Sequence, residues 1–556
     1  MIGVIADPAE ADVVSEFFEL FKTPWEFYRS GQRYDVLIFA GDWPLEGSAN
    51  LVVLYAGKKT RFDDSQKIQT TRSSGRAHVH SYEKARIPIY GNIATFPGQA
   101  NALLTVEDSP HCAGFLSNSS DRFVARIGYD LFSEVRTLLT AGQPVANASL
   151  PTLDLHIAFL RDLITSRGIS LVEIPPVPNG YQFVVCLTHD VDHPAIRRHK
   201  WDHTMVGFLY RATFDSLRKL FRGRLSVREL FKNFGAALKL PLVHLGLAKD
   251  FWREFDDRYL EMEEGLHSTF FVIPFSGQPG RKSDGPAPAM RAARYGAQDI
   301  AGAIRKLIAA GCEVGLHGID AWLDSSKGRQ ELQEIRNLTS ASEEVGVRMH
   351  WLYYDEQSPL ALEQAGAAYD STVGYNGTVG YRAGTTQVYK PLGVARLLEL
   401  PLHVMDTALF YPIHLALSPR QAKTLIGPMF ENAVRLGGTL TINWHDRSLA
   451  PERLWGEFYR DLIQELQSRG AWFATAGQAT SWFRNRRAAG FETHPMGPGT
   501  VRVKLAVDQC DKLPELRLRV HNPRNSGPAG MQRSADFVDM KIAQGVESKI
   551  PSEARR

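Results

Sequence analysis

The sequence predicts an α/β protein whose largest part is a (β/α) barrel of about seven strands. Between residues 183 and 475, short apolar runs alternate with segments of helical periodicity, which is typical of parallel sheets with helical crossovers. Most of these runs end in polar residues suited to catalysis, and the C-terminal strand ends of such a barrel share the rim where active sites are built. A small α/β domain is expected before the barrel and a small β appendage after it.

The length and composition describe a protein of several domains. The chain has 556 residues, of which 44% are hydrophobic and 22% charged, so about two to four domains with ample core are expected. A net charge of +3 gives no argument for nucleic acid as a partner. The cysteines form no CxxC pair, which argues against a disulfide scaffold and a cysteine zinc site; they are Cys112, Cys186, Cys312 and Cys510.

No targeting or membrane-spanning segment is expected. The N-terminus, MIGVIADPAEAD, lacks the basic and long apolar regions of a signal peptide, and no apolar run is long enough to cross a bilayer. The cytoplasm is therefore the expected location, with peripheral contact at the inner membrane face through the basic segment described below.

Residues 1–150 are expected to form the small α/β domain. Apolar residues at helical spacing between positions 8 and 28 separate the first two of four apolar runs, which predicts a parallel sheet, and the polar stretch 58–86 predicts a long loop. No glycine-rich phosphate-binding motif occurs, so the sequence indicates no role for this domain. The four runs are Ile2–Ala6, Tyr34–Gly41, Leu51–Gly57 and Ile87–Gly91.

The barrel is expected over residues 151–481. Its predicted strands are Phe183–Thr188, Ser268–Ile273, Glu313–Leu316, Arg348–Tyr353, a pair around Tyr381 and Leu398–Leu402, Thr439–Trp444, and Ala471–Thr475.

A basic insertion, residues 194–250, interrupts the repeat after the first strand. It carries twelve Lys or Arg against four Asp or Glu, and its apolar residues recur at helical spacing, which predicts a helical hairpin. Such a hairpin suits the surface of an anionic membrane or a polyanionic substrate. A helical cover with a solvated basic face is the simpler interpretation, because the apolar residues must also pack.

The C-terminal part of the chain changes pattern. Alternating apolar and polar residues predict a small β appendage over residues 482–525. Residues 526–556 are rich in Pro, Gly, Ser and charge, which predicts a largely disordered tail.

Two carboxylates follow the first barrel strand, in the segment VVCLTHDVDH. Asp190 and Asp192 lie two residues apart, so in an extended chain they project to the same side, where each opposes ionisation of the other unless a cation lies between them. A capping aspartate beside a solvated one is the structural alternative.

Histidines end four different predicted strands of the same barrel. They are His317, His350, His403 and His445. A single histidine after an apolar run is more often structural than a ligand, but four at one rim are not independent. One carboxylate with two imidazoles makes a good site for zinc or a similar divalent ion and leaves positions open for water and substrate.

These residues carry a resemblance to a known family. LTHDVDH, GLHG and INWHD resemble the first, second and fifth motifs of the polysaccharide deacetylases, carbohydrate esterase family 4, over residues 180–480. The resemblance implies a (β/α) barrel in which Asp190 is the general base, Asp192 and His317 bind the metal, and His445 is the general acid.

The resemblance extends to segments that line the family's substrate groove. YRAGT and LPLHVMD are similar to these segments, which implies substrate-binding roles for Arg382 and Asp406. Trp351 and Tyr354 offer a sugar ring a flat apolar face, although core packing is the ordinary role of an aromatic residue. Trp444 is expected in the core.

One position departs from the family pattern. The second motif usually has another histidine four residues on, and here that position is Ala321. His350 is the candidate that completes the metal shell, and Asp320 is the alternative.

The leading hypothesis is a zinc-dependent hydrolase that removes N-acetyl groups from an amino sugar in a polysaccharide or a lipid-linked precursor. Two alternatives remain on the same fold: a hydrolase of a small linear amide or ureide, and a catalytically degenerate barrel that binds glycan in a polysaccharide-synthesis complex.

Overall fold

The computed structural model divides into two compact units. The first comprises Met1–Gly180, Tyr381–Gly393 and Trp482–Arg556, and the second comprises Tyr181–Gly380 and Val394–Ser481. The structure describes residues 1–73, 77–81, 84–118, 122–221, 223, 225–339, 344–450, 452–492, 500–504, 513–523, 537–542 and 547–549.

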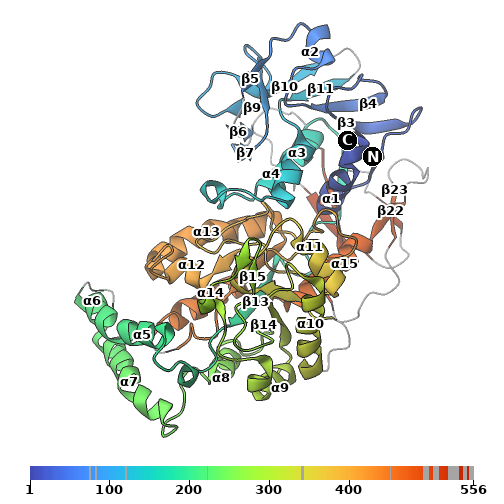
Figure 1. The fold of residues 1–556 in the computed structure, drawn as a ribbon. Helices are drawn as coiled ribbons and strands as arrows, with labels where there is room; N and C mark the ends of the chain where they lie inside the picture. Colours follow the sequence, from blue (N-terminus) through green and yellow to red (C-terminus); the bar gives the residue numbers. More distant parts are fainter. Residues whose placement is uncertain are drawn as a thin grey trace. The chain divides into compact units, whose positions relative to one another are not determined.

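The first unit is built on a mixed sheet (Figure 1). Three of the four expected apolar runs lie among its five parallel strands. The fourth, Ile87–Gly91, falls in the other four strands, which continue the sheet in antiparallel pairs that the strand–helix alternation did not predict. Among the described residues the order is β2 (Trp25–Phe27), β1 (Ile2–Ile5), β3 (Arg33–Ala40), β4 (Ser48–Tyr55), β11 (Phe123–Ile127), β10 (Cys112–Asn118), β9 (Ala102–Val106), β6 (Ala77–Ser81) and β7 (Arg86–Ile89).

Helices and further strands complete the first unit. Helix α1 (Ala11–Phe21) buries its apolar side, including Phe17 and Phe18, as its spacing predicted. The stretch expected to be a long loop contains helix α2 (Arg61–Ser65) and strand β5 (Thr71–Ser73), which pairs with β8 (Ile93–Thr95). The remaining helices are α3 (Leu131–Leu139) and α4 (Thr152–Thr165).

The domain boundaries differ from those expected at residues 150 and 482. Strand β12 (Leu171–Glu173) pairs with β24 (Arg517–His521), so the segment before the barrel and the C-terminal appendage belong to one unit. Such pairing joins residues more than three hundred positions apart, which no local pattern indicates.

Part of the tail that was expected to be disordered forms strands. Strand β25 (Phe537–Lys541) pairs with β24, and β26 (Glu547–Lys549) pairs with β23 (Thr500–Lys504), which in turn pairs with β22 (Gly490–Glu492). The alternation that predicts β24 has a weaker counterpart in β25, whose pairing supplies the order that composition alone does not. Residues 526–536, 543–546 and 550–556 of the expected tail lie outside the described residues.

The second unit is a (β/α) barrel. All pairs in its seven-stranded sheet are parallel, as predicted. Along the described chain the order is β18 (Val347–Met349), β17 (Glu313–Gly318), β14 (Thr269–Val272), β13 (Phe183–Val191), β20 (Thr439–Asn443) and β19 (Val404–Met405), with β21 (Ala471–Phe473) also paired to β13. Isolated parallel bridges link Val347 to Asp370 and Asp370 to Glu399, which carries the curled sheet from β18 towards the segment that leads into β19.

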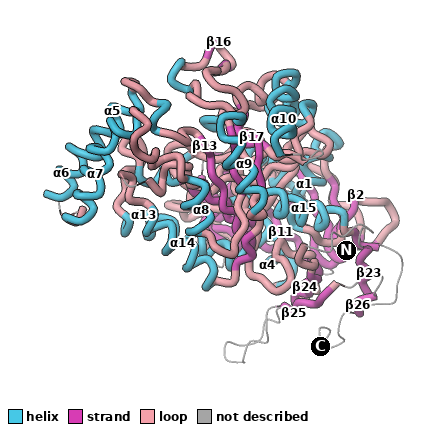
Figure 2. Tube along the Cα trace, turned by 90° about the horizontal axis from the view of Figure 1, so that it is seen from below, coloured by secondary structure: helices cyan, strands magenta, loops and turns pink. Residues whose placement is uncertain are grey.

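Helices surround this sheet (Figure 2). Each presents an apolar stripe to the strands; in α13, for example, Ala422, Ile426, Met429 and Phe430 are buried. The helices are α8 (Phe255–Met262), α9 (Ala301–Ala309), α10 (Ser325–Thr339), α11 (Ser358–Ala365), α12 (Asp406–Phe410), α13 (Pro419–Leu436) and α14 (Gly456–Ser468), and α15 (Ala476–Ala488) leads out of the unit. A short antiparallel pair, β15 (Arg281–Lys282) and β16 (Gly285–Pro286), lies in one connection.

The basic insertion is helical, as predicted. It forms α5 (His203–Tyr210), a π-helical turn (Arg211–Asp215), α6 (Ser216–Phe221) and α7 (Val227–His244). The described helices include none that is both long and apolar enough to cross a membrane.

Two expected barrel strands differ from the structure. The strand predicted at 348–353 ends at Met349, because His350–Leu352 turn as a short 3-10 helix in which Trp351 has a positive φ of 62°. Tyr381 belongs to the first unit, and the segment that contained the other predicted strand supplies β19 at Val404–Met405 instead.

Candidate functional site

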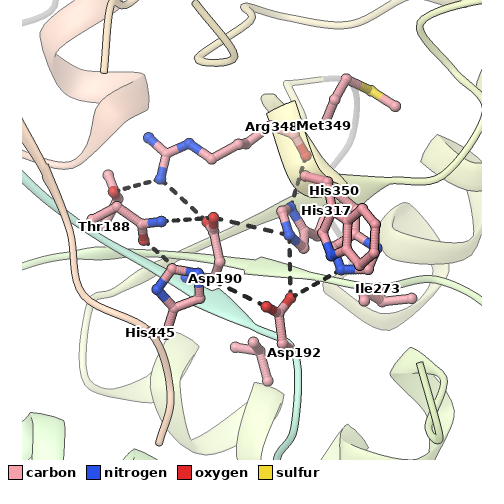
Figure 3. A network of polar contacts seen from close by, with 12 residues as sticks. Thr188, Asp190, Asp192, Ile273, His317, Arg348, Met349, His350 and His445 are labelled. Atoms are coloured by element: carbon pink, nitrogen blue, oxygen red, sulfur yellow. Dashed lines mark hydrogen bonds and ion pairs between the residues drawn. The ribbon is translucent and has the colours of Figure 1, made fainter. Parts of the chain in front are cut away.

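The two aspartates lie at the C-terminal end of β13. This strand is buried along its whole length, and it pairs with β14 on one side and β20 on the other. Asp190 is 3% exposed, and the Asp192 side chain retains 14% of its exposure. Because β17 and β18 end at the same rim, His317 and His350 are carried towards the same point (Figure 3).

Asp192, His317 and His350 form a group suited to a metal ion. One donor atom of each residue lies within 4.8 Å of the others. Asp192 Oδ1 is 3.3 Å from His317 Nε2 and 3.6 Å from His350 Nε2. This oxygen is buried and has no aligned hydrogen-bond partner among the described residues. A buried carboxylate oxygen without a partner is costly, and a cation among these three donors would remove the cost.

The protonation of the two imidazoles fits metal binding. His317 Nδ1 lies 2.9 Å from the carbonyl oxygen of Arg348, which accepts only a donated hydrogen, so Nδ1 carries the proton and the Nε2 lone pair faces Asp192. Burial holds the pKa of His350 well below its usual range, which keeps this imidazole neutral. Burial opposes ionisation of Asp192, but His350, His317 and His445 outweigh it and hold its pKa well below the usual range.

His445 stands on the other side of Asp192. Its Nε2 is 3.8 Å from Asp192 Oδ2, and its Nδ1 donates a 2.6 Å hydrogen bond to Asp406 Oδ1. Burial lowers the pKa of His445, but the negative charges of Asp406, Asp192 and Asp190 outweigh this effect and raise it to about 9. The imidazole is therefore protonated at neutral pH, with Nε2–H directed at the group of side chains in Figure 3.

Asp406 holds His445 through hydrogen bonds. It is fully buried, and its Oδ2 accepts hydrogen bonds from His445 N at 2.7 Å and from Ser448 Oγ. Both carboxylate oxygens are thus engaged within the protein, and the substrate-binding role expected for Asp406 stays a prediction.

Two residues that the sequence analysis did not single out hold Asp190. Asn443 Nδ2 donates to Asp190 Oδ2 at 2.7 Å, and Arg348 Nη1 is 3.2 Å from Asp190 Oδ1. Arg348 also donates to Thr188 Oγ1 and to the carbonyl and hydroxyl of Ser371, so its fully buried guanidinium is fixed in place. A charged residue inside an apolar barrel strand is the signal that could have identified Arg348, because arginine is almost never fully buried without a specific partner.

Trp351 and Tyr354 follow His350 along the chain. Trp351 is 38% exposed, its ring centroid is 5.8 Å from that of His350, and its carbonyl accepts a hydrogen bond from Asn376. Left-handed backbone at a tryptophan is strained, and such strain is often found at ligand-binding sites. Tyr354 is partly exposed. The expected substrate contacts of both residues stay predictions.

Three other predicted positions have contacts of their own. Asp320 bonds to Lys327 Nζ at 2.6 Å and to Arg281 N at 2.7 Å, so the structure groups His350 rather than Asp320 with Asp192 and His317. His403 Nδ1 accepts a hydrogen bond from Thr441 N, a structural contact within the barrel. Arg382 belongs to the first unit, where its carbonyl accepts a hydrogen bond from Gln143 N.

Comparison with known proteins finds similarity at the level of structure. No family model matches the sequence, and no curated protein matches it. The chain is similar to solved polysaccharide deacetylases.

The similarity covers about half of this chain. For a protein of Mycobacterium smegmatis named as a polysaccharide deacetylase, identity is 20%, coverage is 56% of this chain and 94% of that one, and the TM-score is 0.35. For a second such protein, from Pseudomonas aeruginosa PAO1, the values are 15%, 55%, 92% and 0.34. For the Puue allantoinase they are 15%, 58%, 95% and 0.34.

Proposed function

We propose that this protein is a metal-dependent hydrolase that removes N-acetyl groups from an amino sugar in a polysaccharide or its precursor. The observation that carries the proposal is the placement of an anchored carboxylate, Asp190, and a protonated imidazole, His445, beside the donor group Asp192, His317 and His350. A binding module needs no such pair of base and acid, whereas amide hydrolysis needs both.

The donor group fits a divalent transition ion, most simply zinc. One carboxylate and two imidazoles leave coordination positions open for water and for a substrate oxygen. When bound, the ion would supply Lewis-acid chemistry: it polarises a carbonyl and lowers the pKa of water from ~15.7 towards ~7.

Asp190 is the general base in this proposal. Its Oδ2 is 3.9 Å from His317 Nε2, close to the donor group but outside it. Asn443 and Arg348 fix the carboxylate from the side, so it keeps one orientation while it accepts a proton from the attacking water.

His445 is the general acid. Its Nδ1–H is held by Asp406, so Nε2–H is the proton that it can give to the leaving amine. A pKa raised to about 9 keeps this proton in place at neutral pH, and the amine that leaves is basic enough to take it.

The sugar is expected to stack on Trp351. This indole is the large aromatic side chain next to His350 that remains partly exposed, and aromatic faces suit the apolar face of a pyranose. We therefore place the amino-sugar ring over Trp351, with its acetamide directed at the donor group.

The experiment that tests the proposal is release of acetate from N-acetylated glucosamine oligosaccharides by the zinc-loaded protein. The metal-free protein should be inactive. Asp190→Asn should lower turnover about 1000-fold while metal content stays that of the wild type, because it removes the base and keeps the donors. Asp355→Asn, at the start of α11, is a matched control that should leave turnover unchanged.

A linear ureide tested in parallel separates the proposal from its nearest alternative. Hydrolysis of the ureide without acetate release would reassign the substrate class. Metal binding without hydrolysis of either compound would favour a glycan-binding scaffold.

A further inference from the structure

Helices α5, α6 and α7 form a hairpin that is set to one side of the barrel strands in both views (Figures 1 and 2). The two arms bury faces against each other: Asn233 of α7 donates a 2.7 Å hydrogen bond to Ser216 of α6, and both side chains are buried. Apolar residues of both arms share one core cluster with Trp252: Met205, Phe208, Ala212, Ala236, Leu240 and Val243. The helical cover expected from the sequence is therefore a packed element.

Each arm of the hairpin also carries an apolar stripe that nothing covers among the described residues. The exposed positions recur at steps of three, four or seven residues, so each set lies along one side of its helix. Phe214, Phe221 and Phe231 are 74%, 82% and 69% exposed. The first stripe is Val206, Tyr210, Phe214, Leu217 and Phe221, and the second is Val227, Phe231, Leu238, Leu242 and Leu245.

The two stripes lie on opposite outer sides of the hairpin. At about 100° per residue, each exposed stripe is about 160° from the buried stripe of the same helix. Because the buried stripes face each other, the exposed ones face away from each other, and Phe231 of the second stripe also borders an open hollow between α7 and the helices α8 and α14. A protein partner with a single binding face would cover one arm and leave the other exposed, whereas a fluid apolar medium surrounds both.

Cations are interspersed with these apolar residues at the distal end of the hairpin. Arg218, Lys219, Arg228 and Lys232 are exposed there. Within the hairpin, Asp215 pairs with Lys219, and Glu229 caps the N-terminus of α7, so Arg218, Arg228 and Lys232 remain to meet an anion. Helices bind anionic bilayers by combining two kinds of side chain. Large apolar side chains enter the acyl region, and long basic side chains reach the phosphate groups.

We infer that the distal part of this hairpin, residues 214–221 and 225–232, docks into the surface of an anionic lipid bilayer. Phe221 and Phe231 enter the boundary between headgroups and acyl chains, and Arg218, Arg228 and Lys232 contact lipid phosphates. This inference goes beyond the proposed function and does not depend on it. It brings the barrel to a membrane surface whatever the barrel hydrolyses.

The test is sedimentation of the full-length protein with vesicles of phosphatidylglycerol and phosphatidylcholine, beside vesicles of phosphatidylcholine alone. Binding is expected to the anionic vesicles and to weaken as salt is raised. The double variant Phe221→Ser/Phe231→Ser should lower the partition coefficient at least about tenfold, because it removes two large apolar groups from the interface. Arg228→Glu/Lys232→Glu should lower it by a similar factor and reduce the salt dependence.

A matched control is Leu360→Ser, which makes the same kind of change at a residue of α11 that is 40% exposed. Its partition coefficient should equal that of the wild type. Equal binding of the wild type to both kinds of vesicle, or to neither, would overturn the inference. So would a dimer in solution that the phenylalanine variant converts to a monomer, since a second copy would then be the occupant of these stripes.

Discussion

Buried carboxylates in the two units differ in how their charge is balanced. In the first unit, Asp63 is fully buried and holds Arg126 through two contacts, Nε to Oδ1 at 3.0 Å and Nη2 to Oδ2 at 3.1 Å, and it also accepts a hydrogen bond from Thr60 N. In the barrel, Asp192 Oδ1 is buried without an aligned partner and faces two imidazole nitrogens.

The difference separates a structural charge from a functional one. A bidentate ion pair inside a protein satisfies both partners, and breaking it leaves one uncompensated charge. A carboxylate oxygen that the fold leaves without a hydrogen needs something that the chain does not supply. The buried oxygens of the two aspartates are thus distinguished by whether the protein supplies each with a hydrogen-bond donor.

Asp192→Asn should have the largest effect of the variants considered, because it removes the functional carboxylate of this comparison. Loss of the anionic donor should abolish metal binding and lower turnover at least about 1000-fold, because several kcal/mol of transition-state stabilisation depend on the ion. The free energy of unfolding of the metal-free protein should fall by less than it does in Asp63→Asn, since the gain from removing an unsatisfied oxygen offsets part of the stability lost with the charge. Elemental analysis and denaturant unfolding measure both. A strongly destabilised metal-free variant would make Asp192 structural.

Asp63→Asn should lower the free energy of unfolding, because Asp63 is the structural carboxylate of this comparison. It leaves the buried Arg126 guanidinium without its counter-charge, at a cost of about 3 to 5 kcal/mol in unfolding free energy. Denaturant unfolding with hydrogen exchange of β4 and β11 locates the loss. Asp64→Asn is the matched control: its side chain is 66% exposed, and its ion pair with Lys59 is worth less than about 1 kcal/mol. Equal effects of the two variants would contradict the assignment.

His350→Ala should sharpen the comparison by testing the third donor. Removing one imidazole from a set of three should weaken metal affinity at least about 100-fold, which competition with a chelator measures. Asp320→Asn is the control, because Asp320 already bonds to Lys327 and Arg281. Unchanged affinity in the histidine variant would remove His350 from the shell, and loss in the aspartate variant would favour the alternative ligand.

Asp406→Asn should have the smallest of these effects, a shift in pH dependence. His445 donates its proton only when protonated, so turnover falls as pH rises through its pKa. The carboxylate of Asp406 raises that pKa against the effect of burial, and its neutralisation should move the alkaline limb of kcat to lower pH by at least about one unit. Ser448→Ala keeps the charge and should move the limb less. A limb that stays in place in both variants would assign it to another group.

Much of the barrel could be predicted because its strands are local signals. The apolar runs at β13, β14, β17, β20 and β21 each match a strand within a few residues. The turn at His350–Leu352 could not be predicted, since Trp351 is an unusual residue for positive φ. The assignment of Tyr381–Gly393 to the first unit rests on bonds such as Thr386 N to Asp154, which join distant parts of the chain.

The candidate site, like the barrel, could be predicted only in part. Asp190, Asp192, His317, His350 and His445 follow strand ends, so the period of the strands and the rim of the barrel predict their convergence. The contacts that fix these side chains were not predictable. Arg348 on β18 reaches Asp190 on β13 although two other strands, β17 and β14, lie between them in the sheet. The orienting role of Asp406 likewise depends on a side-chain direction that only the folded chain defines.

The pairing of β12 with β24 has a consequence for synthesis on the ribosome. A chain emerges from its N-terminus, and domains generally fold as they appear. Here the first unit needs β24, and it also needs Arg486 and Arg487 against α1, where Arg487 bonds to Glu16 at 2.7 Å. The barrel sequence is therefore translated completely while the unit that precedes it is still unfinished. A nascent chain halted inside the barrel would hold an open sheet edge at β12, so a chaperone that shields such edges would meet this protein early and release it only after β24 has been translated.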